Sequence, residues 1–129
     1  MKKIVFIGLI SISIGAFAES NSYSKSYSQC LDNAGGVTIS TLNCIDAEYK
    51  KQDLRLNANY KKIMSRLSGS TKQDLLDSQR LWIKHRNATC DIYPKIANGT
   101  MFTLLSNECY LSEVKNRAEY LEYLINISE

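Results

Sequence analysis

Residues 75–93 carry a row of positions at helical spacing, and this row limits the possible folds more than any other feature of the chain. Its members recur at intervals of three or four residues and so share one face of an α-helix; they are Leu75, Gln79, Trp82, Arg86, Cys90 and Tyr93. Such a face is normally buried, yet this one carries a guanidinium. Because an unpaired charge removed from water costs several kcal/mol, the sequence predicts a partner for Arg86 on another helix.

Two further segments show helical periodicity, one on each side of this row. The preceding segment ends at the Ser-Gly-Ser turn of residues 68–70 and has a row of apolar residues interrupted by Asp53. The C-terminal segment has Arg117 in a similar row. No run alternates clearly enough to be a strand, and residues 94–107 are predicted to be a loop. We therefore predict an all-α protein, a small bundle of three main helices.

The short turn at residues 68–70 predicts that the first two of these helices form a long antiparallel hairpin. Residues equally far from the turn then face each other, which pairs Asp53 with Arg86. We expect a salt bridge between them, extended by Arg117 from the third helix. Such a network is usually architectural, because it fixes the register of helices. Binding of an anion or a partner is the alternative role.

The first eighteen residues have the pattern of a secretory signal peptide. Lys2 and Lys3 precede an apolar stretch at 4–15, and Ala16 and Ala18 form a small-x-small cleavage site. We expect cleavage near Ala18 and a periplasmic or secreted protein without a membrane anchor in its mature form.

The remaining chain is expected to form a single domain of a common size. Residues 19–29 are rich in Ser, Tyr and Asn and are predicted to be a flexible segment, which leaves 30–129 as the helical domain. Loss of two lysines reduces the basic residues from 16 to 14, against 13 acidic ones. This near-neutral balance gives no indication of a nucleic-acid partner.

All four cysteines lie after the signal peptide, and an even number in a small exported chain favours two disulfides. Three connectivities are possible. We favour Cys30–Cys44 and Cys90–Cys109, because each bond would fasten a glycine-containing loop to the helix beside it. A zinc site is the competing interpretation, but the chain has no C-x-x-C pair and a single histidine. We expect no metal and no cofactor.

The residue inventory does not favour catalysis. His85 lies on the flank of the central helix rather than on its buried face, and oxidised cysteines offer no thiolate nucleophile. The chain has no G-x-S-x-G, no H-E-x-x-H and no glycine-rich phosphate loop. We therefore expect a protein that is not an enzyme.

Three short patterns have their residues at fixed helical offsets, and together they include Trp, Arg and Cys. They are Asp53-x-x-Leu56-Asn57-x-x-Tyr60, Leu76-x-x-Gln79-x-x-Trp82-Ile83-x-x-Arg86-x-x-x-Cys90, and Cys109 followed by Arg117-x-x-x-Leu121. In these patterns the chain resembles the LprI-type lysozyme inhibitor domain, over about Cys30 to Leu124. The resemblance implies an exported, disulfide-stapled helical domain, and for at least one branch of the family it implies inhibition of host lysozyme. The chain lacks the lipidation cysteine of the lipid-anchored inhibitor.

We accordingly expect a protein partner, a lysozyme or another cell-wall hydrolase. An inhibitor of such an enzyme must fill a cleft built around two carboxylates. The predicted loop between Cys90 and Cys109 suits this role, and its candidate contact residues are Tyr93, Lys95, Asn98 and Thr100. The alternative function is a periplasmic immunity or binding module, which neutralises a different toxin or serves an envelope complex.

Overall fold

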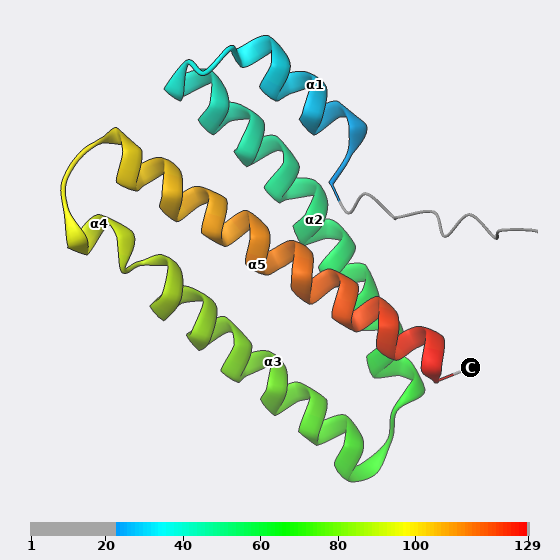
Figure 1. Ribbon diagram of the computed structural model, residues 1–129. Coiled ribbons are helices and arrows are strands. Elements are labelled where there is room, and N and C mark those ends of the chain that lie inside the picture. Colours follow the sequence, from blue (N-terminus) through cyan, green and yellow to red (C-terminus); the bar gives the residue numbers. More distant parts are fainter. Residues whose placement is uncertain (1–22, 129) are drawn as a thin grey trace, which may run out of the picture.

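The computed structural model describes residues 23–128, and within that range all regular structure is helical (Figure 1). The elements in chain order are α1 (Lys25–Ala34), α2 (Thr38–Arg66), α3 (Gly69–Cys90), α4 (Tyr93–Ile96) and α5 (Thr100–Ile127). The predicted all-α class is confirmed. The expected signal peptide lies outside the described residues. None of the described helices has the length and apolar character that a membrane crossing requires.

Helices α2 and α5 form the centre of the molecule and run parallel to each other (Figure 1). Two side chains of α2 donate hydrogen bonds to backbone oxygens of α5: Asn59 Nδ2 to Ala118 at 3.1 Å, and Arg66 Nη1 to Ile125 at 2.8 Å. Both bonds span 59 residues, so the two helices keep one parallel register. The core between them consists mainly of Ile45, Leu56, Ile63, Leu111, Val114, Ala118, Leu121 and Ile125.

The prediction that the first two long helices pack against each other is wrong, because α5 lies between α2 and α3 (Figure 1). The described part of α3 buries only Leu75, Gln79 and Cys90, whereas α5 buries five apolar residues along one face. Helix α5 therefore offers α2 the larger apolar surface and takes the central place. Helix α3 instead packs antiparallel on α5, and the two are linked by the Cys90–Cys109 disulfide.

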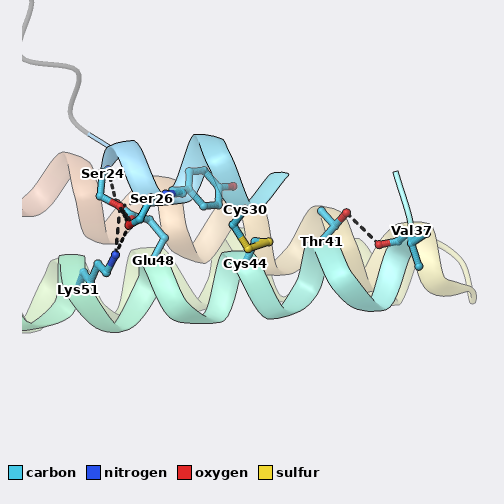
Figure 2. Close-up of a disulfide and its surroundings, with 9 residues drawn as sticks. Ser24, Ser26, Cys30, Val37, Thr41, Cys44, Glu48 and Lys51 are labelled. Carbon is cyan, nitrogen blue, oxygen red and sulfur yellow. Dashed lines mark hydrogen bonds between the residues drawn. A yellow bond between two sulfur atoms is a disulfide. The ribbon is translucent and has the colours of Figure 1, made fainter. Parts of the chain in front are cut away.

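Helix α1 differs from the prediction of a flexible segment that extends to residue 29. It folds back along α2, and the Cys30–Cys44 disulfide ties the two helices together (Figure 2). Ser24 caps its first turn by accepting a hydrogen bond from the Tyr27 amide at 3.2 Å. At the other end Gly35, with a φ of 55°, ends the helix in the left-handed conformation. The polar composition of this segment therefore does not indicate a helix, because tertiary contacts with α2 hold the helix in place.

The predicted loop at 94–107 is also largely helical. Helix α4 occupies its start, and α5 begins at Thr100, so the connection is only residues 97–99. Gly99 has a φ of 132°, a conformation that side chains with a Cβ rarely adopt. The Asn-Gly pair thus marks a boundary between two helices rather than the middle of a loop.

Candidate functional site

The seam between α3 and α5 contains a row of alternating aromatic rings and guanidinium groups. The guanidinium carbon of Arg86 lies 5.1 Å from the Trp82 ring centroid and 5.4 Å from that of Tyr110. The guanidinium carbon of Arg117 lies 5.7 Å from the Trp82 centroid and 5.0 Å from that of Tyr120. These distances are within the range of cation–π attraction. We call the row of Tyr110, Arg86, Trp82, Arg117 and Tyr120 the arginine–aromatic stack.

Within residues 23–128, both arginines of the stack donate hydrogen bonds only to neutral oxygens. Arg117 donates from Nε to Gln79 Oε1 at 2.8 Å and from Nη2 to Ser78 Oγ at 3.0 Å. Arg86 donates from Nε and Nη2 to Asn87 Oδ1, at 3.1 and 3.0 Å. Burial is the main cause that lowers the pKa of Arg117 from its ordinary value. The row of residues predicted on α3 therefore does face another helix, α5. The guanidinium of Arg86 in that row stacks on aromatic rings and is not paired with a carboxylate.

The predicted Asp53–Arg86 salt bridge is absent from the described part of the chain, and so is its extension to Arg117. Asp53 Oδ2 instead accepts a hydrogen bond from Asn57 on its own helix at 3.1 Å. The reason is rotation about the α2 axis as well as the position of α5. Gln52 is buried in the core. Asp53 is the next residue on the helix, so its side chain points in a different direction, and it is only half-buried.

The polar residues that α2 does bury were not identified from the sequence. Glu48 is only 1% exposed and accepts hydrogen bonds from the Ser24 amide at 2.9 Å and from Gln52 Nε2 at 2.8 Å. Burial raises its pKa, but these bonds, that of the Ser24 hydroxyl and the charge of Lys51 outweigh burial and lower the pKa below its ordinary value. Glu48 thereby anchors the start of α1 on α2 (Figure 2).

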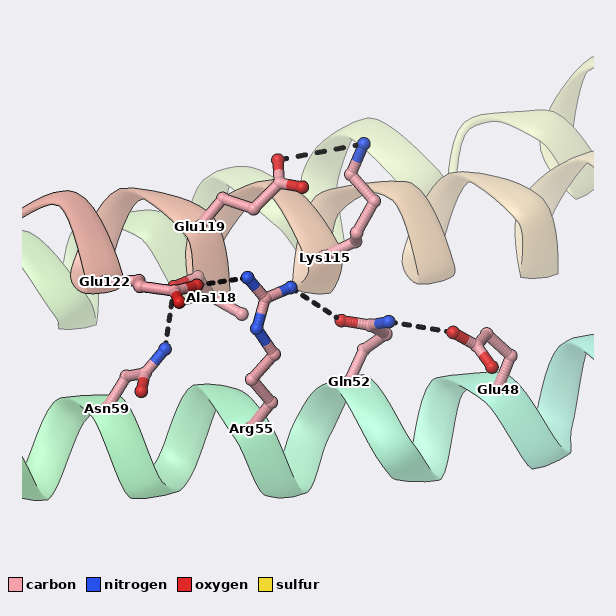
Figure 3. Close-up of polar contacts among 8 residues, drawn as sticks. All are labelled: Glu48, Gln52, Arg55, Asn59, Lys115, Ala118, Glu119 and Glu122. Atoms are coloured by element: carbon pink, nitrogen blue, oxygen red, sulfur yellow. Dashed lines mark hydrogen bonds and ion pairs between the residues drawn. The ribbon is translucent and has the colours of Figure 1, made fainter. Parts of the chain in front are cut away.

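This polar chain continues from α2 to α5 (Figure 3). Gln52 accepts a hydrogen bond from Arg55 at 3.3 Å, and Arg55 forms an ion pair with Glu122 of α5. Glu48 and Gln52 could have been found from the sequence, because they continue the spacing set by Ile45 and lead to Leu56. The network joins three helices without forming a cluster that could hold a metal: no such group of ligands occurs among residues 23–128.

The far end of the α3–α5 pair, residues 92–101, holds the four candidate contact residues, and we call it the α4 end. Tyr93 and Lys95 lie in α4, Asn98 lies in the connection, and Thr100 begins α5. All but Tyr93 are exposed. Three large apolar side chains of the same end are also exposed, by 51 to 65%: Ile92, Ile96 and Met101.

The α4 end is fastened at its base by one disulfide and two hydrogen bonds. The Cys90–Cys109 disulfide has a Cα–Cα distance of 5.5 Å, and Ser106 Oγ donates to the Cys90 carbonyl oxygen at 3.0 Å. The Tyr110 hydroxyl donates to Asp91 Oδ1 at 2.8 Å. Burial and this bond to a carboxylate raise the pKa of Tyr110. The two disulfides join the cysteines that the sequence analysis paired.

A groove of about 460 Å³ lies at the opposite end of the same seam. Its walls come from the end of α2, the start of α3 and the C-terminal half of α5, and include Ile63, Leu75 and Leu124. Tyr120, the last ring of the arginine–aromatic stack, borders it. The seam is thus closed by a disulfide at one end and open at the other.

Comparisons with known proteins agree with this architecture. A family model described as lysozyme inhibitor LprI matches residues 30–121. No curated protein matches the sequence. Among solved structures, an uncharacterised protein from Burkholderia thailandensis is similar, with a TM-score of 0.65 at 20% sequence identity. The match covers 80% of this chain and 52% of that one, so this chain spans about half its length. At this identity the similarity concerns the fold alone.

Proposed function

Since this chain belongs to the lysozyme inhibitor LprI family, we propose that it binds and inhibits a lysozyme-like peptidoglycan hydrolase and has no catalytic activity of its own. The observation that carries the proposal is the family match over residues 30–121, which includes nearly all of the described helices. Two disulfides suit a protein that acts outside the cytoplasm, because that environment is oxidising. We place its action in the periplasm or outside the cell, after removal of the signal peptide.

We further propose that the α4 end is the surface that contacts the hydrolase. The cleft of a glycoside hydrolase contains two carboxylates, which attract a cation and hydrogen-bond donors. Lys95, Asn98 and Thr100 supply such groups and are exposed at the α4 end. Ile96 and Met101 add exposed apolar surface of the kind that anchors protein interfaces. The disulfide at the base limits the conformational entropy that this end loses on binding.

A cell-wall lysis assay tests the proposal. The purified mature protein should slow the digestion of cell walls by a lysozyme, and the effect should reach its maximum when inhibitor and enzyme are near equal amounts. Several classes of lysozyme should be compared. Digestion that proceeds at the same rate under micromolar excess of inhibitor, with every class of enzyme, would exclude the proposed activity. Pull-down from an envelope extract would then identify the partner of an immunity or binding module.

Charge reversal at single lysines tests whether the α4 end is the surface that contacts the hydrolase. Lys95→Glu should weaken inhibition by about tenfold or more, because it places an acid opposite the carboxylates of the cleft. Lys84→Glu is the matched control, since Lys84 is exposed in α3, outside the α4 end. Equal inhibition by both variants would show that another surface binds the enzyme.

A further inference from the structure

We propose that the arginine–aromatic stack is a binding site for carboxylates, in which Arg86 and Arg117 hold acidic groups of a ligand on either side of Trp82. Arg86 follows Trp82 by one helical turn. Arg117 reaches the other side, because it is hydrogen-bonded to Ser78 and Gln79, about one turn before Trp82. Two cations thus flank a single ring, with guanidinium carbons 5.1 and 5.7 Å from its centroid.

The first supporting observation is that neither cation is neutralised within the described part of the chain. Among residues 23–128, no carboxylate forms an ion pair with Arg86 or Arg117. The carboxylate of Asp91 accepts a hydrogen bond from the hydroxyl of Tyr110, a ring of the stack, and forms no ion pair with either arginine. A half-buried guanidinium without an anion has lost hydration and has gained no charge partner. An anionic ligand would supply that partner.

The second observation is that both guanidinium groups keep hydrogen-bond donors that no side chain uses. A guanidinium has five N–H donors in a planar fork. On Arg86 the Asn87 amide oxygen takes one from Nε and one from Nη2. On Arg117 the oxygens of Gln79 and Ser78 take the corresponding two. Nη1 of each group therefore has no acceptor among the described residues.

These two observations define the class of ligand. A planar fork with free donors matches a carboxylate, which can accept two parallel hydrogen bonds. Stacking between aromatic rings holds each guanidinium in place, so little side-chain entropy is lost when the ligand binds. Because the two cations flank one ring, a ligand with two carboxylates can engage both. Such a ligand is a small dicarboxylate or a pair of acidic side chains of a protein.

The fluorescence of Trp82 provides a direct test, because it is the only tryptophan of the chain. The mature protein should be titrated with sodium succinate, and with sodium chloride at matched ionic strength. We expect succinate to change the emission in a saturable manner and to raise the melting temperature, as a ligand of the native state does. Chloride should reproduce neither effect. An equal response to both salts would reduce the effect to general screening and overturn the proposal.

Substitutions show whether the two arginines are responsible. Arg117→Gln and Arg86→Gln should each weaken succinate binding by about tenfold or more. Arg80→Gln is the control, since Arg80 is exposed on α3 and pairs with Asp77 on the surface. Arg117→Lys keeps the charge and loses the fork, so it should bind more weakly than the wild type. Circular dichroism verifies folding. Unchanged succinate binding in folded Arg117→Lys and Arg86→Gln would contradict the proposal.

A second titration distinguishes the two sources of the carboxylates. A short peptide of consecutive glutamates replaces succinate, with a glutamine peptide of equal length as control. Tighter binding of the glutamate peptide than of succinate would assign the site to acidic segments of a protein. Binding of succinate alone would assign it to small dicarboxylates, and binding of neither would overturn the proposal. No hydrolase takes part in these measurements, so their result does not depend on whether the protein inhibits one.

Discussion

Glu48 is the one ionisable side chain among the buried polar residues of the described range, 23–128. It is almost fully buried, and its acceptors are satisfied by Ser24 and Gln52. A buried carboxylate without such donors would become protonated or destabilise the fold. Here the donors come from two different helices, so the charge couples the cap of α1 to the side of α2.

We predict that Glu48→Gln lowers the free energy of unfolding at neutral pH by about 1–3 kcal/mol, because the hydrogen bonds to a charged acceptor are lost. The pKa of Glu48 is lowered by folding. Its stabilising contribution is therefore complete above the ordinary carboxyl pKa, about 4.3, and is lost as the pH falls through the lowered value. Urea denaturation at neutral pH and below pH 4.3 measures both effects.

The variant should lose less stability on acidification than the wild type does. Asp46→Asn is the matched control, because Asp46 is exposed on the same helix and forms a surface ion pair with Lys50. Its unfolding free energy should stay within about 0.5 kcal/mol of the wild type. An acid dependence of Glu48→Gln identical to that of the wild type would show that Glu48 does not stabilise the fold through its charge.

Helix α5 packs with two of its faces, and the sequence pattern does not separate them. The face toward α2 is the fully buried row that contains Val114, Ala118 and Leu121. The face toward α3 carries the stacked residues Arg117 and Tyr120. Neighbouring residues on a helix differ by about 100° in direction, so the two rows interleave along the chain. For this reason the spacing alone predicts Arg117 on the same row as the apolar residues, whereas it lies on the face toward α3.

We predict that Ala118→Leu lowers the free energy of unfolding by about 1–3 kcal/mol, because the added side chain cannot fit between α2 and α5. Ala118 is fully buried, and its carbonyl oxygen accepts the hydrogen bond of Asn59 at 3.1 Å. Ala58→Leu on the exposed side of α2 adds the same atoms and should change the value little. A shift of the urea midpoint of equal size in both variants would mean that Ala118 does not set the helix spacing.

At the scale of the whole described structure, α2 and α5 form a firmly packed pair, to which α3 is more weakly attached. Helix α3 buries few apolar side chains, and the groove next to Leu75 shows that its start is incompletely packed. The disulfide Cys90–Cys109 secures only its other end. Local stability follows buried apolar contact, so α3 should open before the central pair.

We predict that the double substitution Cys90→Ala and Cys109→Ala lowers stability by about 2–4 kcal/mol. Amide hydrogens of α3 should then exchange much faster, while those of α2 keep more of their protection. Hydrogen exchange measured by mass spectrometry resolves the two helices.

Removing Cys30 and Cys44 instead provides the comparison, and should affect α1 rather than α3, because that bond joins α1 to α2. Uniform loss of protection along the chain in both double variants would show that the molecule opens as a single unit.

Local periodicity and residue chemistry were sufficient to predict the helical class, the face of α3 that is buried, and the two disulfide pairs. These features depend on neighbours within a few residues, or on the limited ways in which four cysteines can pair. The same information predicted Asp53 on the buried face of α2, where the structure has Gln52, and predicted no helix before Cys30.

Only the tertiary structure decided which helices are neighbours. Helix α2 could bury its apolar face against α3 or against α5, and the choice depends on the apolar area that each offers far along the chain. Helix α5 offers the larger apolar area and takes the central place. Arg86 and Arg117 therefore both stack on the Trp82 ring and do not meet Asp53. An amphipathic pattern states that a face is buried, but it carries no information on the partner that buries it.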